Sequence, residues 1–259
     1  MARTFLATLH FDGACFAGWQ RQAEGRTVQA VLEQVLQQLT GAPARAHATG
    51  RTDAGVHAIG LAVSFALPDR WAGPDVHRAL NALLPGDVWT AEVREARAGF
   101  HARTRAASRR YRYVIGTDAA SASPFRHRYE WALRRAVNVA TLQQAAHALT
   151  GEHDFSAFSV RSSPRAHKRC RIALAEWRER PDGTGVIFEI AADRFLHHMV
   201  RMLVGTMTDM GLGRRAVSDM QRLLAQEPGV RTSPPAPSQG LYFVAAEYPP
   251  EWFLDGGGQ

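Results

Sequence analysis

The chain reads TFLATLHF at residues 4–11 and TVQAVLEQVLQQLTG at residues 27–41, a strand-like stretch followed by a helix-like one. The first stretch is mostly apolar and short enough for a strand. In the second, the apolar residues recur at helical spacing along one face: Val28, Val31, Leu32, Val35, Leu36 and Leu39. Thr27 is a typical N-cap and Gly41 a typical helix end, so we predict a helix between them.

The remaining segments predict further helices and strands, in an order that repeats in the two halves of the chain. In the first half we predict strands over 44–48, 56–65 and 88–95 and a helix over 75–84, which gives β-α-β-β-α-β. The second half repeats the order approximately, with a strand over 110–116, a helix capped by Asn138, a hairpin of 172–180 with 185–192, helices over 197–212 and 218–225, and a strand over 240–248. We therefore predict an α+β fold of two ferredoxin-like (βαββαβ) halves with antiparallel sheets.

Charge and composition favour a polyanionic partner. The net charge is +7 with a sequence pI of about 10.2, and lysine supplies only one of the 31 basic residues. Residues 94–135 hold 11 arginines against three acids, and 161–171 form a second basic cluster. Such clusters are also typical of solvated surfaces, but two of them on one basic chain favour binding of a nucleic acid.

Other features of the composition exclude several classes of protein. A hydrophobic content of 46% excludes a disordered chain, and no apolar run approaches the roughly 20 residues that a membrane span needs. Polar residues interrupt the N-terminus too often for a signal peptide. Cys15 and Cys170 lack metal-type spacing, so we expect a cytoplasmic protein.

The predicted halves set the domain boundaries. We expect an N-terminal domain over 1–105, a C-terminal domain over 106–250 and a frayed tail over 251–259. Two antiparallel sheets placed side by side can line a central basic cleft, where RNA could lie.

The most informative segment reads ATGRTDAGVHA at residues 48–58, between two predicted strands. Loops between rigid strands often hold functional groups. Gly50 and Gly55 flank Asp53 and permit tight turns and close approach of a ligand. Arg51 would favour the ionised carboxylate that a nucleophile or general base needs. Taken alone, the same residues could form a turn with a surface salt bridge.

The segment 50–58 resembles the signature of the tRNA pseudouridine synthase A family (TruA family), and other blocks match in the same order. These blocks are FDG with FAGWQ at 11–20, TVQ at 27–29, ALNALLP at 79–85, FHAR at 100–103, RYRY at 110–113, FLHHMVR at 195–201 and GLY at 240–242. Phe11 stands where tyrosine is frequent, Arg110 where lysine is common, and 158–168 match less closely.

The resemblance implies roles for four residues. Asp53 matches the family's catalytic aspartate, and Tyr111 its substrate-contacting tyrosine, although Tyr111 could also be a core residue because Tyr113 shares its face. Arg51 and Arg201 match active-site arginines that would pair with Asp53 and phosphate and fill the space left by a flipped uridine. For Asp53 the open routes are attack at C1′, attack at C6 and removal of a proton from C2′.

The resemblance also implies a substrate and an assembly. The expected reaction isomerises uridine to pseudouridine at positions 38, 39 and 40 in the tRNA anticodon arm. It is redox-neutral, so we expect no cofactor and no metal. The expected enzyme is a homodimer that recognises RNA by shape and phosphate contacts, with no membrane and no small-molecule cofactor.

Three alternatives stay open at this point. The chain could be a non-catalytic RNA-binding protein, a metal-dependent nuclease that uses Asp53 with nearby histidines, or a synthase for another RNA site. The paired His197 and His198 fall in a predicted helix, where adjacent side chains point about 100° apart and chelate poorly, which favours structural or RNA-contacting roles. For His101 and Arg103 we expect backbone contacts with RNA, and for Trp19 a packing role.

Overall fold

The computed structural model describes residues 2–159 and 168–254. Most of the basic cluster expected at 161–171 lies outside these residues. The chain divides into two compact units, one of residues 1–109 with 243–259 and one of residues 110–242. The sequence instead grouped 106–250, whereas residues 106–109 and the residues from 243 onwards, which include most of the C-terminal strand, belong to the first unit.

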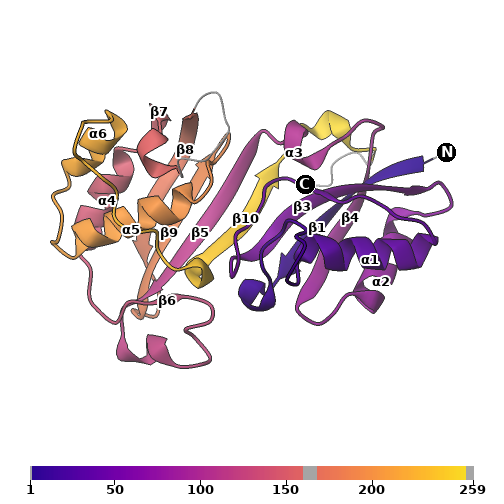
Figure 1. The fold of residues 1–259 in the computed structure, drawn as a ribbon, viewed down its shortest axis with the longest axis horizontal. Helices are drawn as coiled ribbons and strands as arrows, with labels where there is room; N and C mark the ends of the chain where they lie inside the picture. The colour runs from indigo at the N-terminus through magenta and orange to yellow at the C-terminus, as the bar shows by residue number, and fades with distance from the viewer. Residues whose placement is uncertain (1, 160–167, 255–259) are drawn as a thin grey trace. The chain divides into compact units, whose positions relative to one another are not determined.

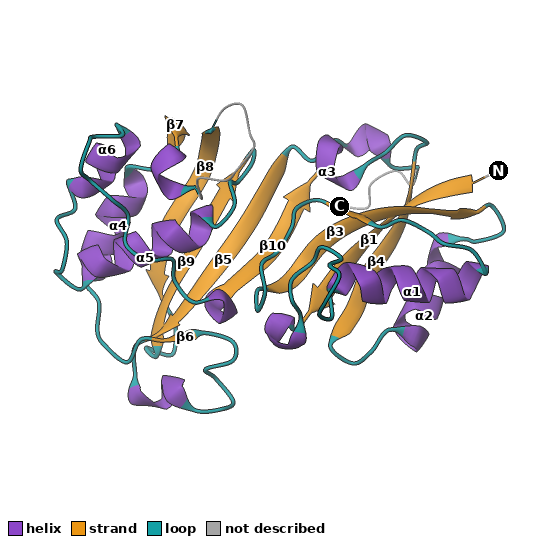
Figure 2. Ribbon diagram, viewed as in Figure 1, coloured by secondary structure: helices purple, strands orange, loops and turns teal. Residues whose placement is uncertain are grey.

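The first unit has the predicted β-α-β-β-α-β order. Its elements are β1 (Ala2–Phe11), α1 (Val28–Thr40), β2 (His47–Ala48), β3 (His57–Pro68), α2 (Gly73–Leu83), β4 (Val88–Ala96) and the short α3 (Ala102–Arg105). The strands lie in the order β4-β1-β3-β10, where β10 (Leu241–Glu247) is the last strand of the chain. β1 runs antiparallel to both β3 and β4, and α1 and α2 lie on one face of this sheet (Figures 1 and 2).

The ends of α1 follow from its sequence. The Thr27 hydroxyl accepts a hydrogen bond from the Ala30 N–H, and Gly41 closes the helix in the left-handed conformation with φ 76°. The strand expected over 44–48 shrinks to two residues, because side chains of α1 take the backbone groups of Ala46. Gln29 Nε2 donates to the Ala46 carbonyl at 3.2 Å, and Glu33 Oε1 accepts from its N–H at 3.1 Å.

Strand β3 has two neighbours on the side away from β1. β2 pairs with its second half, where Ala48 lies opposite Val63. β10 approaches its first half, and Gly60 marks the closest point, since a Cβ there would lie 1.9 Å from the Val244 carbonyl oxygen. The return of the chain to this sheet explains why 243–254 join the first unit.

Residues that the sequence assigned to a frayed tail are packed. Phe253 is buried and belongs to an apolar cluster with Leu6, Ala62, Ala96, Phe100 and Ala102, against which Tyr248 and Trp252 also pack. The expectation of a tail beginning at 251 is therefore wrong for 251–254, because aromatic side chains anchor them to the sheet.

The second unit also combines helices with strands. Its elements are β5 (Ser108–Gly116), β6 (Trp131–Ala132), α4 (Val139–His147), β7 (Gly151–Asp154), β8 (Arg169–Glu179), β9 (Gly185–Ala192), α5 (Met199–Gly211) and α6 (Asp219–Leu224). The strand order is β5-β9-β8-β7, and β8 and β9 form the predicted hairpin. β6 pairs with β5 in parallel, so the pairing is not purely antiparallel as predicted. The molecule is thus a mixed α+β protein.

Within the described part of the chain, none of the helices is both long enough and apolar enough to cross a membrane.

Candidate active site

The loop that carries Asp53 connects β2 to β3 and is held against the segment after β1. The Trp19 N–H donates to the Thr52 carbonyl at 3.1 Å, and the Gly55 N–H donates to the Phe16 carbonyl at 3.3 Å. The Val56 N–H donates to the Asp53 carbonyl at 3.2 Å and closes a turn around Asp53. Asp53 is half-buried, so part of the residue stays accessible to solvent.

Glycines allow the two segments to touch. A Cβ at Gly18, whose φ is +98°, would lie 2.6 Å from the Thr52 carbonyl oxygen and 3.1 Å from the Asp53 carbonyl carbon. A Cβ at Gly13 would lie 2.1 Å from the Val56 carbonyl oxygen. Only glycine fits at both places, so the position of the Asp53 backbone depends on them.

Two side chains near this loop have structural roles. Trp19 is buried, which confirms the expected packing role. His57 is buried and its Nδ1 accepts a hydrogen bond from the Gly13 N–H at 3.0 Å, while Asp12 Oδ1 lies 3.2 Å from the same nitrogen. His57 therefore ties the loop to the turn after β1.

A second set of hydrogen bonds fixes the start of the loop. The Thr49 hydroxyl lies within hydrogen-bond distance of the Ala62 carbonyl, at 2.9 Å, and also contacts the Tyr248 hydroxyl. The Tyr248 hydroxyl in turn lies 2.9 Å from the Ala102 carbonyl in α3. Burial raises the pKa of Tyr248 to about 12, so its hydroxyl keeps its proton to a higher pH than an ordinary tyrosine does. The sequence blocks that match the family do not include Thr49 or Tyr248. The hydrogen-bond partners of these two residues are distant in the chain.

Arg51 belongs to the same loop and is exposed. An exposed guanidinium beside a half-buried carboxylate can contact a phosphate while the carboxylate faces a sugar or base. The first unit thus presents both loop residues expected from the sequence, Arg51 and Asp53.

Tyr111 and Tyr113 lie in β5 of the second unit and point to its buried face, as the alternation predicted. The Tyr111 ring packs edge-on against Phe195 at a centroid distance of 5.0 Å. Tyr113 is fully buried and donates to the Pro237 carbonyl at 2.6 Å. Burial raises the pKa of Tyr113 well above its usual range, and the charge of Arg201 opposes that rise.

Arg201 lies in α5, and its side chain is half-buried against the segment before β10. Its Nε donates to the Ala236 carbonyl at 2.7 Å, and its own carbonyl accepts from the Ala236 N–H at 2.9 Å. A Cβ at Gly205 would lie 2.1 Å from the Pro234 carbonyl oxygen, so this segment packs closely on the helix. Arg201 is held by its neighbours, unlike a free surface arginine.

The two histidines before α5 differ from the sequence expectation. The helix begins at Met199 because His198 adopts the left-handed conformation with φ 63°. His197 and His198 therefore precede the helix, and their ring centroids lie 4.1 Å apart. The inference from helical spacing was wrong at this point, since a left-handed residue turns the chain before the helix starts.

Comparisons with known proteins agree along most of the chain. A family model described as tRNA pseudouridine synthase matches residues 7–103 and 145–249, which include Arg51, Asp53 and Arg201 but not Tyr111. The tRNA pseudouridine synthase A of Solidesulfovibrio magneticus is 40% identical over 256 residues, 96% of this chain and 92% of that protein. The protein of the same name from Moorella thermoacetica is 38% identical over 243 residues, 93% of this chain and 98% of that one.

A solved structure of a Cbf5-Nop10-Gar1 complex aligns with 96% of this chain and 50% of its own chain. Its TM-score is 0.39 at 13% identity, which is too remote to support an argument.

Proposed function

Because this chain belongs to the tRNA pseudouridine synthase family, we propose that it isomerises uridine to pseudouridine at positions 38, 39 and 40 of the tRNA anticodon arm. The observation that carries the proposal is the near full-length similarity to tRNA pseudouridine synthase A, which includes the loop around Asp53. The structure supports it with a loop whose backbone is fixed on two sides and whose carboxylate remains half-exposed.

The proposed reaction breaks the C1′–N1 glycosidic bond, rotates the uracil and joins C1′ to C5. The hydrogen on C5 leaves as a proton, and N1 of the product gains one, so the reaction is an isomerisation without a cofactor. Asp53 is the proposed catalytic carboxylate in whichever of the three routes operates: attack at C1′, attack at C6 or removal of a proton from C2′. Each route needs the ionised form.

The other three residues are proposed to bind the substrate. Tyr111 would place its ring against the uracil, supported by Phe195. Arg51 would contact phosphate near the target, and Arg201 would stabilise the flipped nucleotide. A paired uridine must leave its helix to reach any of them, at a cost of about a few kcal/mol.

The assembly and location follow the same family reasoning. We propose that a homodimer binds the tRNA anticodon arm in the cytoplasm, with no metal and no small-molecule cofactor. The central basic cleft expected from the sequence stays a prediction. Phosphate contacts should dominate the binding free energy, so affinity should fall steeply with salt.

The experiment that tests the proposed function maps pseudouridine after reaction. Unmodified tRNA transcripts with uridine at 38, 39 or 40 are incubated with purified protein, and modified positions are read after carbodiimide treatment and primer extension. We expect stops at those three positions and none elsewhere. Modification at another position would identify a synthase for a different RNA site.

Two controls separate the remaining alternatives. Reactions with a chelator should keep full activity, and the RNA should keep its length. RNA that is shortened without the chelator and keeps its length with it would indicate a metal-dependent nuclease. Tight binding without any modified uridine would indicate a non-catalytic RNA-binding protein.

A further inference from the structure

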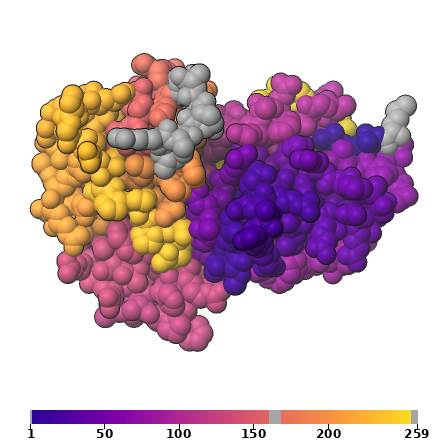
Figure 3. All heavy atoms as spheres, in the orientation of Figure 1, coloured from indigo at the N-terminus to yellow at the C-terminus, as the bar shows by residue number. Residues whose placement is uncertain are grey.

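Residues 117–130 of the second unit leave β5 at Gly116 and return beside it, where Trp131 pairs with Ile115. The family model does not match these residues, because its matches end at 103 and resume at 145. In the space-filling view this part of the chain, drawn in pink, forms a lobe at the edge of the second unit (Figure 3). We call it the 117–130 segment.

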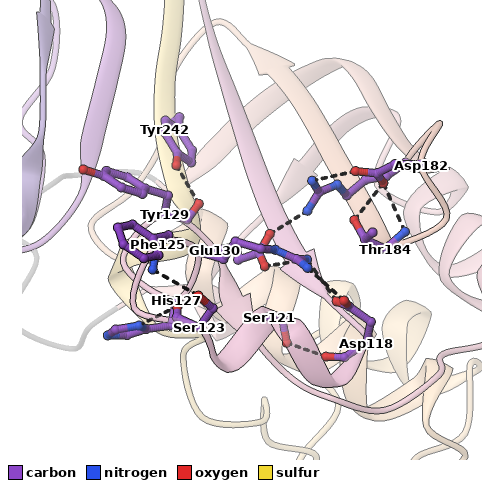
Figure 4. Close-up of polar contacts among 12 residues, drawn as sticks. Asp118, Ser121, Ser123, Phe125, His127, Tyr129, Glu130, Asp182, Thr184 and Tyr242 are labelled. Atoms are coloured by element: carbon purple, nitrogen blue, oxygen red, sulfur yellow. Dashed lines mark hydrogen bonds and ion pairs between the residues drawn. The ribbon is translucent and has the colours of Figure 1, made fainter.

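A cluster of ion pairs holds the segment in place (Figure 4). Arg126 contacts both carboxylate oxygens of Asp118, at 2.8 and 2.9 Å, and approaches Glu130 at 2.8 Å. Arg180 at the end of β8 donates to Glu130 at 2.6 Å and to Asp182 at 3.1 Å. Glu130 is only 4% exposed, so its two arginine contacts are largely shielded from water, and the contact with Arg180 binds the segment to the hairpin of β8 and β9.

Backbone contacts add to this rigidity. A Cβ at Gly116 would lie 2.3 Å from the Ser121 Cβ and 2.6 Å from Glu130 Oε1, so the segment folds back onto a glycine. The Tyr242 hydroxyl donates to the Tyr129 carbonyl at 2.6 Å. Turn hydrogen bonds run from the N–H groups of 123, 126, 127 and 129 to carbonyls within the segment. The segment is therefore ordered without any partner.

This rigid support presents aromatic rings and positive charge to solvent. Phe125 is 87% exposed and Tyr129 41% exposed, and Figure 4 shows both rings on the side away from the Asp118 and Asp182 carboxylates. Arg128 lies over the Tyr129 ring at 5.9 Å. Glu130 is the only acid between 119 and 137, and it is buried among its ion pairs, whereas Arg128, Arg134 and Arg135 are exposed.

We propose that the 117–130 segment is a second RNA-contacting surface, on which Phe125 stacks on an unpaired base of the tRNA while the exposed Arg128 contacts a phosphate. This inference rests on the proposed function, since it deepens the account of how tRNA is bound. An exposed ring on a segment that also exposes an arginine matches the surfaces that bind single-stranded nucleic acid, where each base offers a face for stacking.

Charge favours RNA over a second copy of this chain. A symmetric dimer through this surface would place Arg128 of both copies in the interface, because a two-fold interface uses the same patch on both sides. The two acids of the segment, Asp118 and Glu130, are already held in ion pairs with arginines, which leaves them little capacity to compensate that charge.

The test compares three substitutions of Phe125 for binding of whole tRNA by fluorescence anisotropy. Because Phe125 is exposed, none of them should disturb folding. Stacking requires a flat ring, so F125A and F125L should both weaken affinity about 5- to 150-fold, while F125W keeps it. W89A is the matched control, an exposed aromatic residue of β4 in the first unit, and should bind tRNA as the wild type does.

Other outcomes would overturn the inference. Wild-type affinity of F125A would exclude a stacking role. A leucine variant that binds tRNA normally, with F125A reducing the mass seen in sedimentation, would instead identify a protein interface. Tritium release from C5-labelled tRNA at saturating enzyme keeps the two proposals apart. If the wild-type protein releases tritium and F125A binds tRNA with unchanged affinity, only the RNA surface is refuted. If F125A loses affinity but the wild-type protein releases no tritium, only the isomerase is refuted.

Discussion

Replacement of Gly18 by alanine should reduce catalysis by displacing the backbone of Asp53. The new Cβ would lie 2.6 Å from the Thr52 carbonyl oxygen and 3.1 Å from the Asp53 carbonyl carbon, whereas ordinary contact begins near 3.4 Å. The loop must therefore move by up to about 0.8 Å, and a misplacement on the order of 1 Å can cost about 100-fold in rate. We expect kcat to fall about 10- to 100-fold. The positive φ of Gly18 adds about 1–2 kcal/mol of instability.

Gly41 provides the matched control. Its φ is +76°, and a Cβ there would meet nothing within 4 Å. G41A should therefore show the same cost of about 1–2 kcal/mol in thermal unfolding but keep the wild-type kcat. Both variants are assayed by tritium release from anticodon-arm transcripts at saturating RNA. If folded G18A kept a kcat within about twofold of G41A, the contact with Gly18 would not set the position of the catalytic loop.

Three further predictions concern the supports of the two units. Y248F should lower the free energy of unfolding by about 1 kcal/mol and reduce kcat while leaving tRNA affinity unchanged. The reason is that the contact with Thr49 at the start of the catalytic loop is lost. Equal effects on affinity and kcat would contradict this prediction. The same hydroxyl, with its pKa raised to about 12, should stabilise the fold below pH 10 and lose that contribution between pH 10 and 12, because only the unfolded tyrosine ionises there. The difference in stability between wild type and Y248F should therefore fall by about 2–3 kcal/mol in urea titrations across that range, so that the advantage of wild type at neutral pH turns into an advantage of Y248F. A constant difference would refute the shift. E130A should destabilise the second unit by about 2–4 kcal/mol, since Arg126 and Arg180 lose a buried partner, and E130Q should recover part of this loss. A free energy of unfolding of E130A equal to that of wild type would show that the ion pairs contribute little.

The regular elements could be predicted from the sequence because local signals coincide with tertiary packing. Thr27 and Gly41 fix the ends of α1, and the period-2 pattern of β5 places Tyr111 and Tyr113 on the buried face. The Asp53 loop could be found because its residues are contiguous and resemble a family signature. Its scaffold could not be found in that way, because Gly13, Gly18 and Tyr248 contact it from distant parts of the chain.

Departures from the prediction have the same origin. The strand at 44–48 is short because Gln29 and Glu33 take the hydrogen bonds of Ala46, and α5 starts late because His198 is left-handed. Residues 251–254 look like a tail in sequence, yet Phe253 packs against Phe100, which lies far away in the chain. Long-range contacts of this kind leave no periodic signal.

The most direct test of the central claim is tritium release from tRNA labelled at uridine C5, with wild type and D53N compared at saturating RNA and without added metal. Asparagine keeps the size of the side chain but cannot act as an ionised carboxylate, so we expect release by wild type and at least a 1,000-fold lower rate for D53N, on the order of the loss of an essential catalytic group. Unaltered tRNA affinity and thermal unfolding of D53N would show that only the chemistry is lost. Equal release by both proteins would contradict the assignment of Asp53 as the catalytic carboxylate.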